Sequence, residues 1–323
     1  MYIFENGSGS AEDPFLIQSL ADLQGIDDVD GDGNPNFIGR HFRQTVDIDA
    51  AGFNTINSFM ECHYDGNGRK ITDLDVPFIN WYGWDTAAEK YVNSLRNLTF
   101  EDCSAVLFFA CHYVFFDNVH IDRGSGFSNY LSDCRLKDCS SKNIIAPSGF
   151  DSIGGQTVRF FGAVAAQANR TKFEACEVDT VEVESSTGYV YYIGGFAGSL
   201  NDCEAIDLKV RGFTHTMDLG ASVTPSSDTA KHIGGAIGSV SGCEINGLSV
   251  EDVAVLMRFY SGWARDRIGG AIGYFYDGKV SNARVKNVNI QRINGLPGTR
   301  CFAGGFSGEL EAVEVEDCLA YDV

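Results

Sequence analysis

Short runs of alternating apolar and polar residues follow one another along the C-terminal half of the chain. Clear examples are residues 206–210 and 313–316, in which every second residue is apolar, and residues 285–290 alternate less strictly. A period of two residues is typical of a β-strand with one buried face. Helical spacing is nearly absent here, and consecutive strands without crossover helices exclude a doubly wound α/β sheet.

A glycine motif recurs through the same half. Ile-Gly-Gly-x-x-Gly occupies residues 193–198, 233–238 and 268–273, and variants occupy 161–165 and 303–308. The first glycines of the four clear copies are 40, 35 and 35 residues apart. Periods of roughly 20–50 residues are typical of solenoids, propellers and arrays. A propeller blade needs four hairpin-linked strands, whereas each repeat here carries two or three, so the sequence predicts an all-β, single-stranded parallel β-helix.

Small residues fit this architecture. Paired glycines permit tight corners or close approach between stacked rungs. The ten cysteines contain no CxxC pair, and Cys176, Cys203 and Cys243 fall at strand-like positions. A buried thiol acts as a small apolar filler. We therefore expect reduced core cysteines and folding in a reducing compartment.

Several segments carry a family resemblance. Residues 7–17, 42–49 and 64–71, together with the glycine motifs, resemble GLUG-repeat proteins, whereas residues 80–155 match weakly. The resemblance implies a right-handed parallel β-helix similar to pectin-lyase-like folds. It implies little chemistry, because GLUG repeats occur mostly as scaffolding and binding modules in bacterial surface adhesins, large secreted proteins and phage-like proteins.

We expect one continuous body, with an N-terminal cap and first rungs in residues 1–50 and the repeats in residues 51–323. A short helix is predicted over residues 19–24, where Ser19 serves as N-cap and Asp22 follows. Such a helix covers the first rung's open edge. Residues 313–323 predict no matching C-terminal helix, so we expect a covering partner there, such as a second copy in a trimer.

Charge narrows the choice of partners. The chain has 44 acidic and 24 basic residues, and its net charge of −20 argues against nucleic-acid and anionic-membrane partners. No apolar run approaches the about 20 residues that a membrane span needs. Residues 1–20 lack a basic segment followed by an apolar one, so no signal peptide is expected.

Insertions between rungs fall at one phase of the repeat, in residues 185–192, 213–231, 254–267 and 291–301. Insertions at the same phase of the repeat lie on one face of the coil, and in repeat proteins this face often binds ligand. Aromatic rings can stack on sugars, and the alternative is that they pack the loops onto the coil. The candidate ligand-binding residues are Trp81, Tyr82, Trp84, Arg258, Tyr260 and Trp263.

A carboxylate-rich turn near the N-terminus suggests calcium. Its oxygens follow the spacing of a calcium loop and Gly33 occupies the sharp turn, although Gly39 stands where the bidentate Glu is usual. The alternative is a polar turn. The candidate ligands of this structural calcium ion are Asp28, Asp30, Asp32, Asn34 and Asn36.

No catalytic residue is predicted. P-loop, nucleophile-elbow, zincin and dinucleotide motifs are absent. The Cys62-His63 and Cys111-His112 pairs would diverge, because neighbours on a strand face opposite ways. Glycan-cleaving enzymes use paired carboxylates, but spacing alone cannot pair the candidates Asp117, Asp122, Asp133 and Asp138.

The sequence therefore favours a non-enzymatic adhesion module, most simply a phage virion or tail-fibre part that is assembled in the host cytoplasm. Its partner would be a cell-surface glycan or another surface protein. Two alternatives stay open: a tailspike-like polysaccharide hydrolase or lyase, and a fragment of a bacterial adhesin that is secreted or held at the cell surface.

Overall fold

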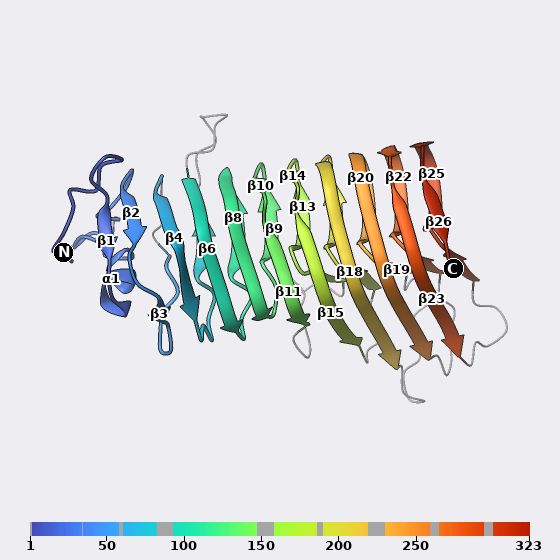
Figure 1. Cartoon of the computed structure of the whole chain (residues 1–323), viewed down its shortest axis with the longest axis horizontal. Coiled ribbons are helices and arrows are strands. Elements are labelled where there is room, and N and C mark those ends of the chain that lie inside the picture. Colours follow the sequence, from blue (N-terminus) through green and yellow to red (C-terminus); the bar gives the residue numbers. More distant parts are fainter. Residues whose placement is uncertain are drawn as a thin grey trace.

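The computed structural model describes residues 2–33, 35–57, 61–82, 93–146, 158–185, 190–218, 230–258, 265–293 and 300–323. Strands make up 66% of the chain and helix 2%. Within the described ranges, every ladder between two named strands is parallel. The strands stack side by side along the long axis (Figure 1). The prediction of an all-β chain with parallel pairing is confirmed.

The strands fall into four stacked rows, which we call A to D in chain order within one coil. Row A contains β12 (Val158–Phe161), β16 (Val190–Gly194), β19 (Ala230–Gly234), β21 (Arg265–Gly269) and β24 (Arg300–Gly304). Row B contains β5 (Ile79–Tyr82), β7 (Phe108–His112), β9 (Ser128–Ser132), β13 (Ala165–Asn169), β17 (Ala197–Asn201) and the beginnings of β20 (Ile237–Arg258), β22 (Ile272–Ser281) and β25 (Ser307–Glu316).

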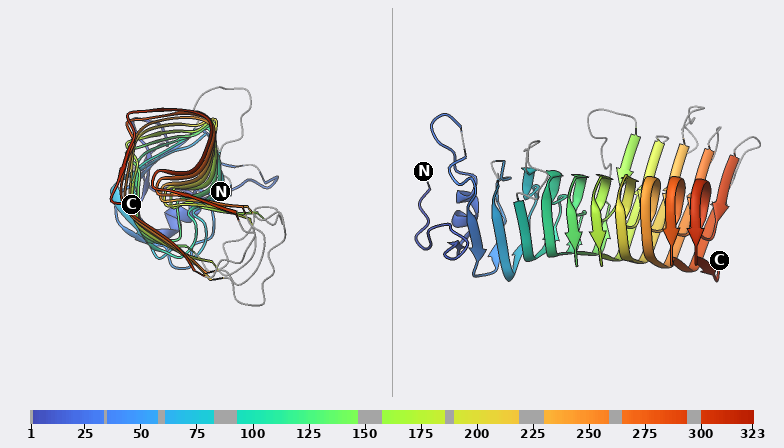
Figure 2. Two further views of the ribbon diagram at one scale, coloured as in Figure 1. Left: turned by 90° about the vertical axis from the view of Figure 1, so that its right-hand side faces the viewer. Right: turned by 90° about the horizontal axis from the view of Figure 1, so that it is seen from above.

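Row C contains β1 (Phe15–Ile17), β2 (His41–Gln44), β10 (Arg135–Lys137), β14 (Lys172–Glu174), the first parts of β4 (His63–Thr72), β6 (Asn93–Cys103), β8 (Val114–Gly124) and β18 (Glu204–Asp218), the middle of β20 and the later parts of β22 and β25. Row D contains β3 (Ile48–Asp49), β11 (Ser140–Ile145), β15 (Glu177–Ser185), β23 (Arg284–Ile293), β26 (Leu319–Tyr321) and the ends of the longer strands. An end-on view shows the coils superimposed (Figure 2).

The glycine motif forms the corner between rows A and B. Motif residues pair with their equivalents in the next coil, as Ile233 does with Ile268. The Gly195 N–H donates to the Gly235 carbonyl at 3.1 Å. A Cβ on Gly235 would lie 2.1 Å from the Gly270 carbonyl oxygen, far inside contact distance. The predicted close approach of stacked glycines is therefore confirmed.

The other three corners are made by residues with positive φ, mostly Asp, Asn and Gly, the types that adopt this conformation at least cost. In the successive coils they are Tyr113, Asp133, Arg170, Asp202, Gly242, Asp277 and Ala312 after row B; Asn97, Asn118, Asp138, Ala175, Asp207, Gly247, Asn282 and Asp317 after row C; and, where row D itself bends, Asp102, Arg123, Asn143, Thr180, Gly212, Asp252, Asn287 and Asp322. Nine of the chain's 44 acidic residues thus stand at these corners.

One corner carries a poorly suited residue. Thr180 is β-branched yet has φ 61°, whereas Asn143 and Gly212 stand at the equivalent positions of adjacent coils. We expect Thr180→Asn to raise the free energy of unfolding by about 1 kcal/mol, since Asn tolerates this conformation better. Urea denaturation would measure it. Gly212→Thr should be destabilising, and a stabilising Gly212→Thr would contradict this account of the corners.

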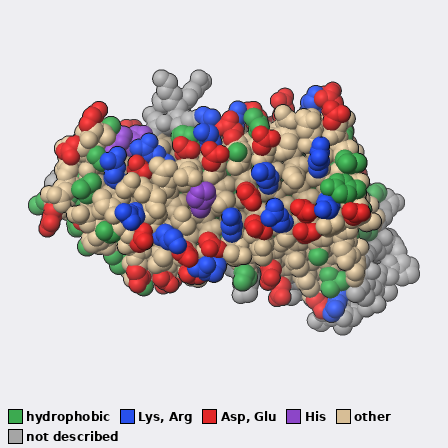
Figure 3. All heavy atoms as spheres, viewed as in Figure 1, with side chains coloured by type: hydrophobic (Ala, Val, Ile, Leu, Met, Phe, Trp, Pro, Cys, Tyr) green, Lys and Arg blue, Asp and Glu red, His purple; other side chains and the backbone are tan. Residues whose placement is uncertain are grey.

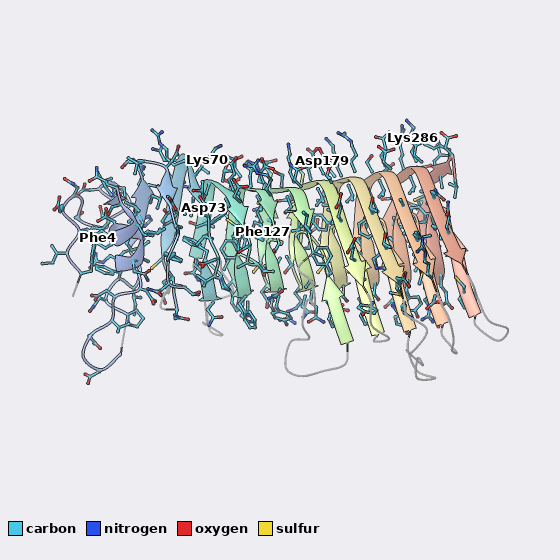
Figure 4. All side chains as sticks on the ribbon, turned by 90° about the horizontal axis from the view of Figure 1, so that it is seen from below. Phe4, Lys70, Asp73, Phe127, Asp179 and Lys286 are labelled. Carbon is cyan, nitrogen blue, oxygen red and sulfur yellow. The ribbon has the colours of Figure 1, made fainter. Side chains whose placement is uncertain are left out.

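The coil interior is filled by one apolar core. Phe127 is fully buried and its ring centroid lies 5.0 Å from those of Phe108 and Phe116. Figure 4 shows Phe127 inside the coil, while Lys70 and Lys286 project from one long edge. All ten cysteines are free and eight are buried, so their predicted role as core filler is confirmed.

The N-terminal end carries the expected helix. Helix α1 spans Leu20–Gly25, and the Ser19 side chain accepts from the Asp22 N–H at 3.1 Å, as predicted. Leu23 is buried, and α1 lies at the N-terminal end of the stack (Figure 1). Among the described residues, no helix is long and apolar enough to span a membrane.

The last coil presents apolar side chains to solvent. The described segment 300–323 contains strands and no helix. Its exposed large apolar residues are Phe302, Leu310, Val315, Leu319, Tyr321 and Val323. The covering partner is expected because residues 313–323 predict no C-terminal helix, and it stays a prediction.

Candidate ligand-binding site

The aromatic residues chosen from the sequence fall mostly outside the described structure. Trp84, Tyr260 and Trp263 lie outside the described residues. Trp81 and Tyr82 end strand β5, and only their backbone is described. None of these five can therefore be placed in a site, and their ligand-binding role stays a prediction.

Arg258 is described, and its predicted place in a side loop is wrong. Strand β20 continues through Arg258, because Val253, Val255 and Met257 alternate inward and stay buried. The Arg258 guanidinium lies 3.7 Å from the carboxylate of Asp218, its register partner on β18. Arg258 thus belongs to the end of row D, at the base of the loop rather than within it.

The carboxylate-rich turn is described except for Asn34. One Asp28 carboxylate oxygen accepts hydrogen bonds from the Tyr2 N–H at 2.8 Å and the Asn36 amide at 2.7 Å. The Asp30 carboxylate accepts from the Asp32 N–H at 2.9 Å. Across the described ranges, no group of three or more His, Cys, Asp and Glu residues could hold a metal ion. The calcium site stays a prediction.

The most distinctive surface is a seam where the outer faces of rows A and B meet. Glycines of row B make this contact possible: a Cβ on Gly198 would lie 2.7 Å from the Tyr192 carbonyl oxygen, and one on Gly238 would lie 2.9 Å from that of His232. The missing side chains therefore let the two rows lie against each other (Figure 2).

Aromatic and cationic side chains continue along this seam from coil to coil. The rings of Phe160 and Tyr192 stack at 4.9 Å with an interplanar angle of 11°. The His232 ring follows at 4.7 Å from Tyr192 and lies 5.0 Å from Tyr274 of row B. We call this set, completed by Arg267, Phe302 and Glu309, the seam column. Phe302 ends it and is 40% exposed.

Arg267 contacts three other members of the seam column. Its guanidinium lies 4.3 Å from the centre of the Tyr274 ring, within cation–π range. It also donates to His232 Nε2 at 2.8 Å and pairs with Glu309. The Tyr274 hydroxyl in turn donates to the Glu311 carboxylate at 2.8 Å. The result is an ordered row of flat rings with polar groups beside it.

The surroundings of His232 in the seam keep its imidazole uncharged near neutral pH. Burial, together with the positive charge of Arg267, lowers the pKa of His232 to about 3. Burial and the hydrogen bond to Glu311 raise the pKa of Tyr274 to about 12. Near neutral pH the imidazole is therefore neutral and accepts from Arg267, and the phenol keeps the proton that it donates.

The lowered pKa of His232 predicts acid sensitivity. An unfolded histidine titrates near 6.5, so stability is complete above that value and falls as the pH drops toward 3. Between about pH 7.5 and about pH 5, the free energy of unfolding of the wild type should fall by about 2 kcal/mol more than that of His232→Gln, because the variant lacks the imidazole. Denaturation of both proteins at the two pH values measures it. An equal loss in both would contradict the buried neutral imidazole.

Charged residues elsewhere form ladders across the coils. Arg123 binds Asp102 at 2.6 Å and Glu101 at 2.5 Å, and Arg170 binds Asp133 at 2.7 Å. Acidic and basic side chains are intermixed over the face in Figure 3. Of the four carboxylates considered for catalysis, Asp133 and Asp138 form corners, and Asp122 binds Arg123 at 3.1 Å. These three carboxylates therefore have structural roles in the coil.

A groove of about 390 Å³ runs along the corner between rows C and D. It opens where Ala175 and Gly247 stand in place of larger corner residues. Glu177, Lys209 and Arg284 line it with both charge signs. Its described lining contains no aromatic ring, so it lacks the flat surfaces that favour sugars.

Sequence reasoning missed the seam column, although the sequence carries a signal for it. The residue immediately before the motif's first apolar position is aromatic or cationic in all five copies. These residues are Phe160, Tyr192, His232, Arg267 and Phe302. Because equivalent repeat positions stack, this regularity alone places them in one column.

No family model matches the chain. No curated protein matches it in sequence. Among solved structures, it is similar to a "putative immunoglobulin A1 protease" from Bacteroides ovatus, with 16% identity, a TM-score of 0.45 and coverage of 98% of this chain and 87% of that one. Endopolygalacturonase I from Stereum purpureum, complexed with two galacturonates, shows 10% identity, a TM-score of 0.38 and coverage of 94% and 100%. Both TM-scores are too low to support an argument.

Proposed function

We propose that the chain is a right-handed, single-stranded parallel β-helix of the GLUG-repeat kind that acts as a non-enzymatic adhesion module. Its ligand is a cell-surface glycan, bound along the seam column. The observation that carries the proposal is the stack of Phe160, Tyr192, His232 and Arg267 on successive coils. The partly exposed rings of the column offer apolar contact to a sugar, and neighbouring polar groups hold the hydroxyls.

The repeat spacing suits an extended ligand. Adjacent parallel strands lie about 4.8 Å apart, so the seam column offers a partly exposed ring or a cation at most of these steps, while the His232 ring is buried. A linear polysaccharide lying along the axis would meet several equivalent contacts at once. Many weak contacts on a rigid support produce strong attachment without deep pockets.

We assign this module to a phage virion or tail fibre, and a bacterial surface adhesin is the alternative. Buried free thiols support folding in a reducing cytoplasm, where virion parts are assembled. The apolar last coil supports assembly with further protein, such as a homotrimer. Light scattering of the purified chain tests the assembly: a stable oligomer is expected, and a monomer at all concentrations would contradict it.

The binding proposal is tested on a microarray of bacterial lipopolysaccharides and capsular polysaccharides. Wild type is expected to bind a subset of these glycans, and Tyr192→Ala and Phe302→Ala to weaken binding about tenfold or more, as loss of an anchoring ring does. Phe109→Ala is the matched control, since Phe109 and Phe302 are both 40% exposed and Phe109 lies outside the seam column. Binding that is equally reduced by all three variants, or absent in wild type, would contradict the proposal.

A tailspike-like hydrolase is the second candidate, favoured by one observation. Glu309 and Glu311 are two residues apart on β25, so they face the same way, and they are held by Arg267 and Tyr274. Two carboxylates at about 6–7 Å fall within the range of glycosidase pairs. Release of reducing ends from a bound glycan, abolished by Glu309→Gln or Glu311→Gln, would establish hydrolysis.

A further inference from the structure

Rows A and D pack face to face beyond the coil, at the base of the side loops (Figure 2). The inward positions of row A in this layer include Tyr191, Lys231 and Asp266, which are register neighbours on adjacent strands. All three are fully buried. Lys231 Nζ lies 3.7 Å from Asp266 Oδ1. An amine and a carboxyl group are therefore held together in a layer without solvent access.

The surroundings of the pair are mainly apolar. Row D presents His215 toward it, with Val183 and Val255 as the register neighbours of His215. All three are at most 1% exposed. Burial lowers the pKa of His215 to about 3, so the imidazole is neutral. His215 thus supplies a neutral base on the facing row.

This pair differs from every other ion pair that the described residues form. The remaining pairs keep both side chains partly exposed, the least exposed being Arg267 at 14% and Asp65 at 15%, whereas Lys231 and Asp266 are both at 0%. Burial of two full charges costs several kcal/mol per ion in real proteins. Exclusion of water therefore favours the neutral amine and the neutral carboxylic acid. A neutral amine is a nucleophile, and a neutral carboxyl group is an acceptor for it.

We propose that Lys231 and Asp266 condense into an intramolecular isopeptide bond. Lys231 Nζ attacks Asp266 Cγ, a C–N bond forms, and the C–OH bond breaks. The hydroxyl group leaves with one amine proton as water, which balances the reaction without an oxidant, a reductant or a cofactor. Because the fold holds the two groups close together, they should react far faster than the same groups free in solution.

The bond would fasten two coils to each other at a mechanically useful place. Lys231 lies on β19, in the first row of one repeat, and Asp266 lies on β21, in the first row of the next. A covalent link there keeps β19 and β21 in register when a bound surface pulls on the chain. The inference does not depend on the proposed glycan, because neither residue belongs to the seam column.

Intact mass spectrometry of the purified, reduced full chain tests the proposal. Because condensation of a preorganised pair releases one water molecule, wild type is expected about 18 Da lighter than its sequence. Protease digestion should yield one branched peptide that joins the segments containing Lys231 and Asp266. A wild-type mass equal to that of the sequence, or a loss of water that maps to other residues, would overturn the proposal.

Variants give the matched controls. Lys231→Arg and Asp266→Ala should each restore the full sequence mass. Lys70→Arg should keep the loss of water, since the Lys70–Glu101 pair is as close as 2.7 Å but solvent-exposed. If a buried variant fails to fold, the wild-type mass and its branched peptide still decide the question. Glycan binding by an unlinked wild type would leave the proposed function standing.

Discussion

Gly270→Ala is expected to lower the free energy of unfolding by about 3 kcal/mol or more. A Cβ at this position would lie 2.0 Å from the Gly305 carbonyl oxygen and 2.7 Å from Val288 Cγ2. The first neighbour is backbone, which cannot move away without separating stacked coils. The Gly270 N–H also donates to the Gly304 carbonyl at 3.0 Å, so relief would break the ladder. Urea denaturation measures the change.

Gly31→Ala is the matched control for this substitution. Nothing lies within 4 Å of a Cβ at Gly31, and its φ is not in the positive region. Stability should therefore stay within about 0.5 kcal/mol of wild type. If Gly270→Ala were as harmless as Gly31→Ala, the glycine motif would not be a point of backbone contact, and the coil stacking described here would be wrong.

Phe127→Ala is expected to cost about 3–5 kcal/mol, the usual range for removing a buried aromatic ring. Phe127 has no solvent exposure, and its ring contacts those of Phe108 and Phe116, which both lie in the preceding coil. The variant would leave a cavity that stacked coils cannot close without shifting register. Chemical denaturation followed by intrinsic fluorescence would report the loss.

Phe109→Ala provides the comparison on the adjacent strand position. Phe109 is next to Phe108 on β7 but points outward and is 40% exposed. Its removal should cost less than about 1 kcal/mol, because little apolar area is withdrawn from the core. Similar losses for Phe127→Ala and Phe109→Ala would contradict the assignment of inward and outward faces.

The architecture could be predicted because short-range sequence patterns determine which residues face inward and which ones stack. Alternation fixes which residues face inward, and a motif that repeats every 35 to 40 residues fixes which residues stack. The Ser19 cap of α1 and the glycine corner followed from the same local rules. The outward divergence of Cys111 and His112 did too, since Cys111 is buried and His112 half-exposed.

Part of the candidate site could not be predicted from the sequence, because it depends on contacts between different rows. Tyr192 and His232 stand at equivalent repeat positions of row A, but the contact of Arg267 with Tyr274 joins rows A and B at positions that the repeat does not relate. Large aromatic residues drew attention to the loops instead. The strand end at Arg258 was also misplaced, because alternation continued into a segment that the repeat phase had assigned to an insertion. Corner aspartates resembled candidate acids, since composition does not reveal φ.

The most direct test of a non-enzymatic, glycan-binding coil is one measurement of binding and product together. Purified wild-type protein is incubated with each polysaccharide that it retains on the array, and the recovered glycan is sized by mass spectrometry. The account predicts retention of the glycan at its original length, with retention lost in Tyr192→Ala. Shortened glycan chains that require Glu309 or Glu311 would contradict it and would make the molecule an enzyme.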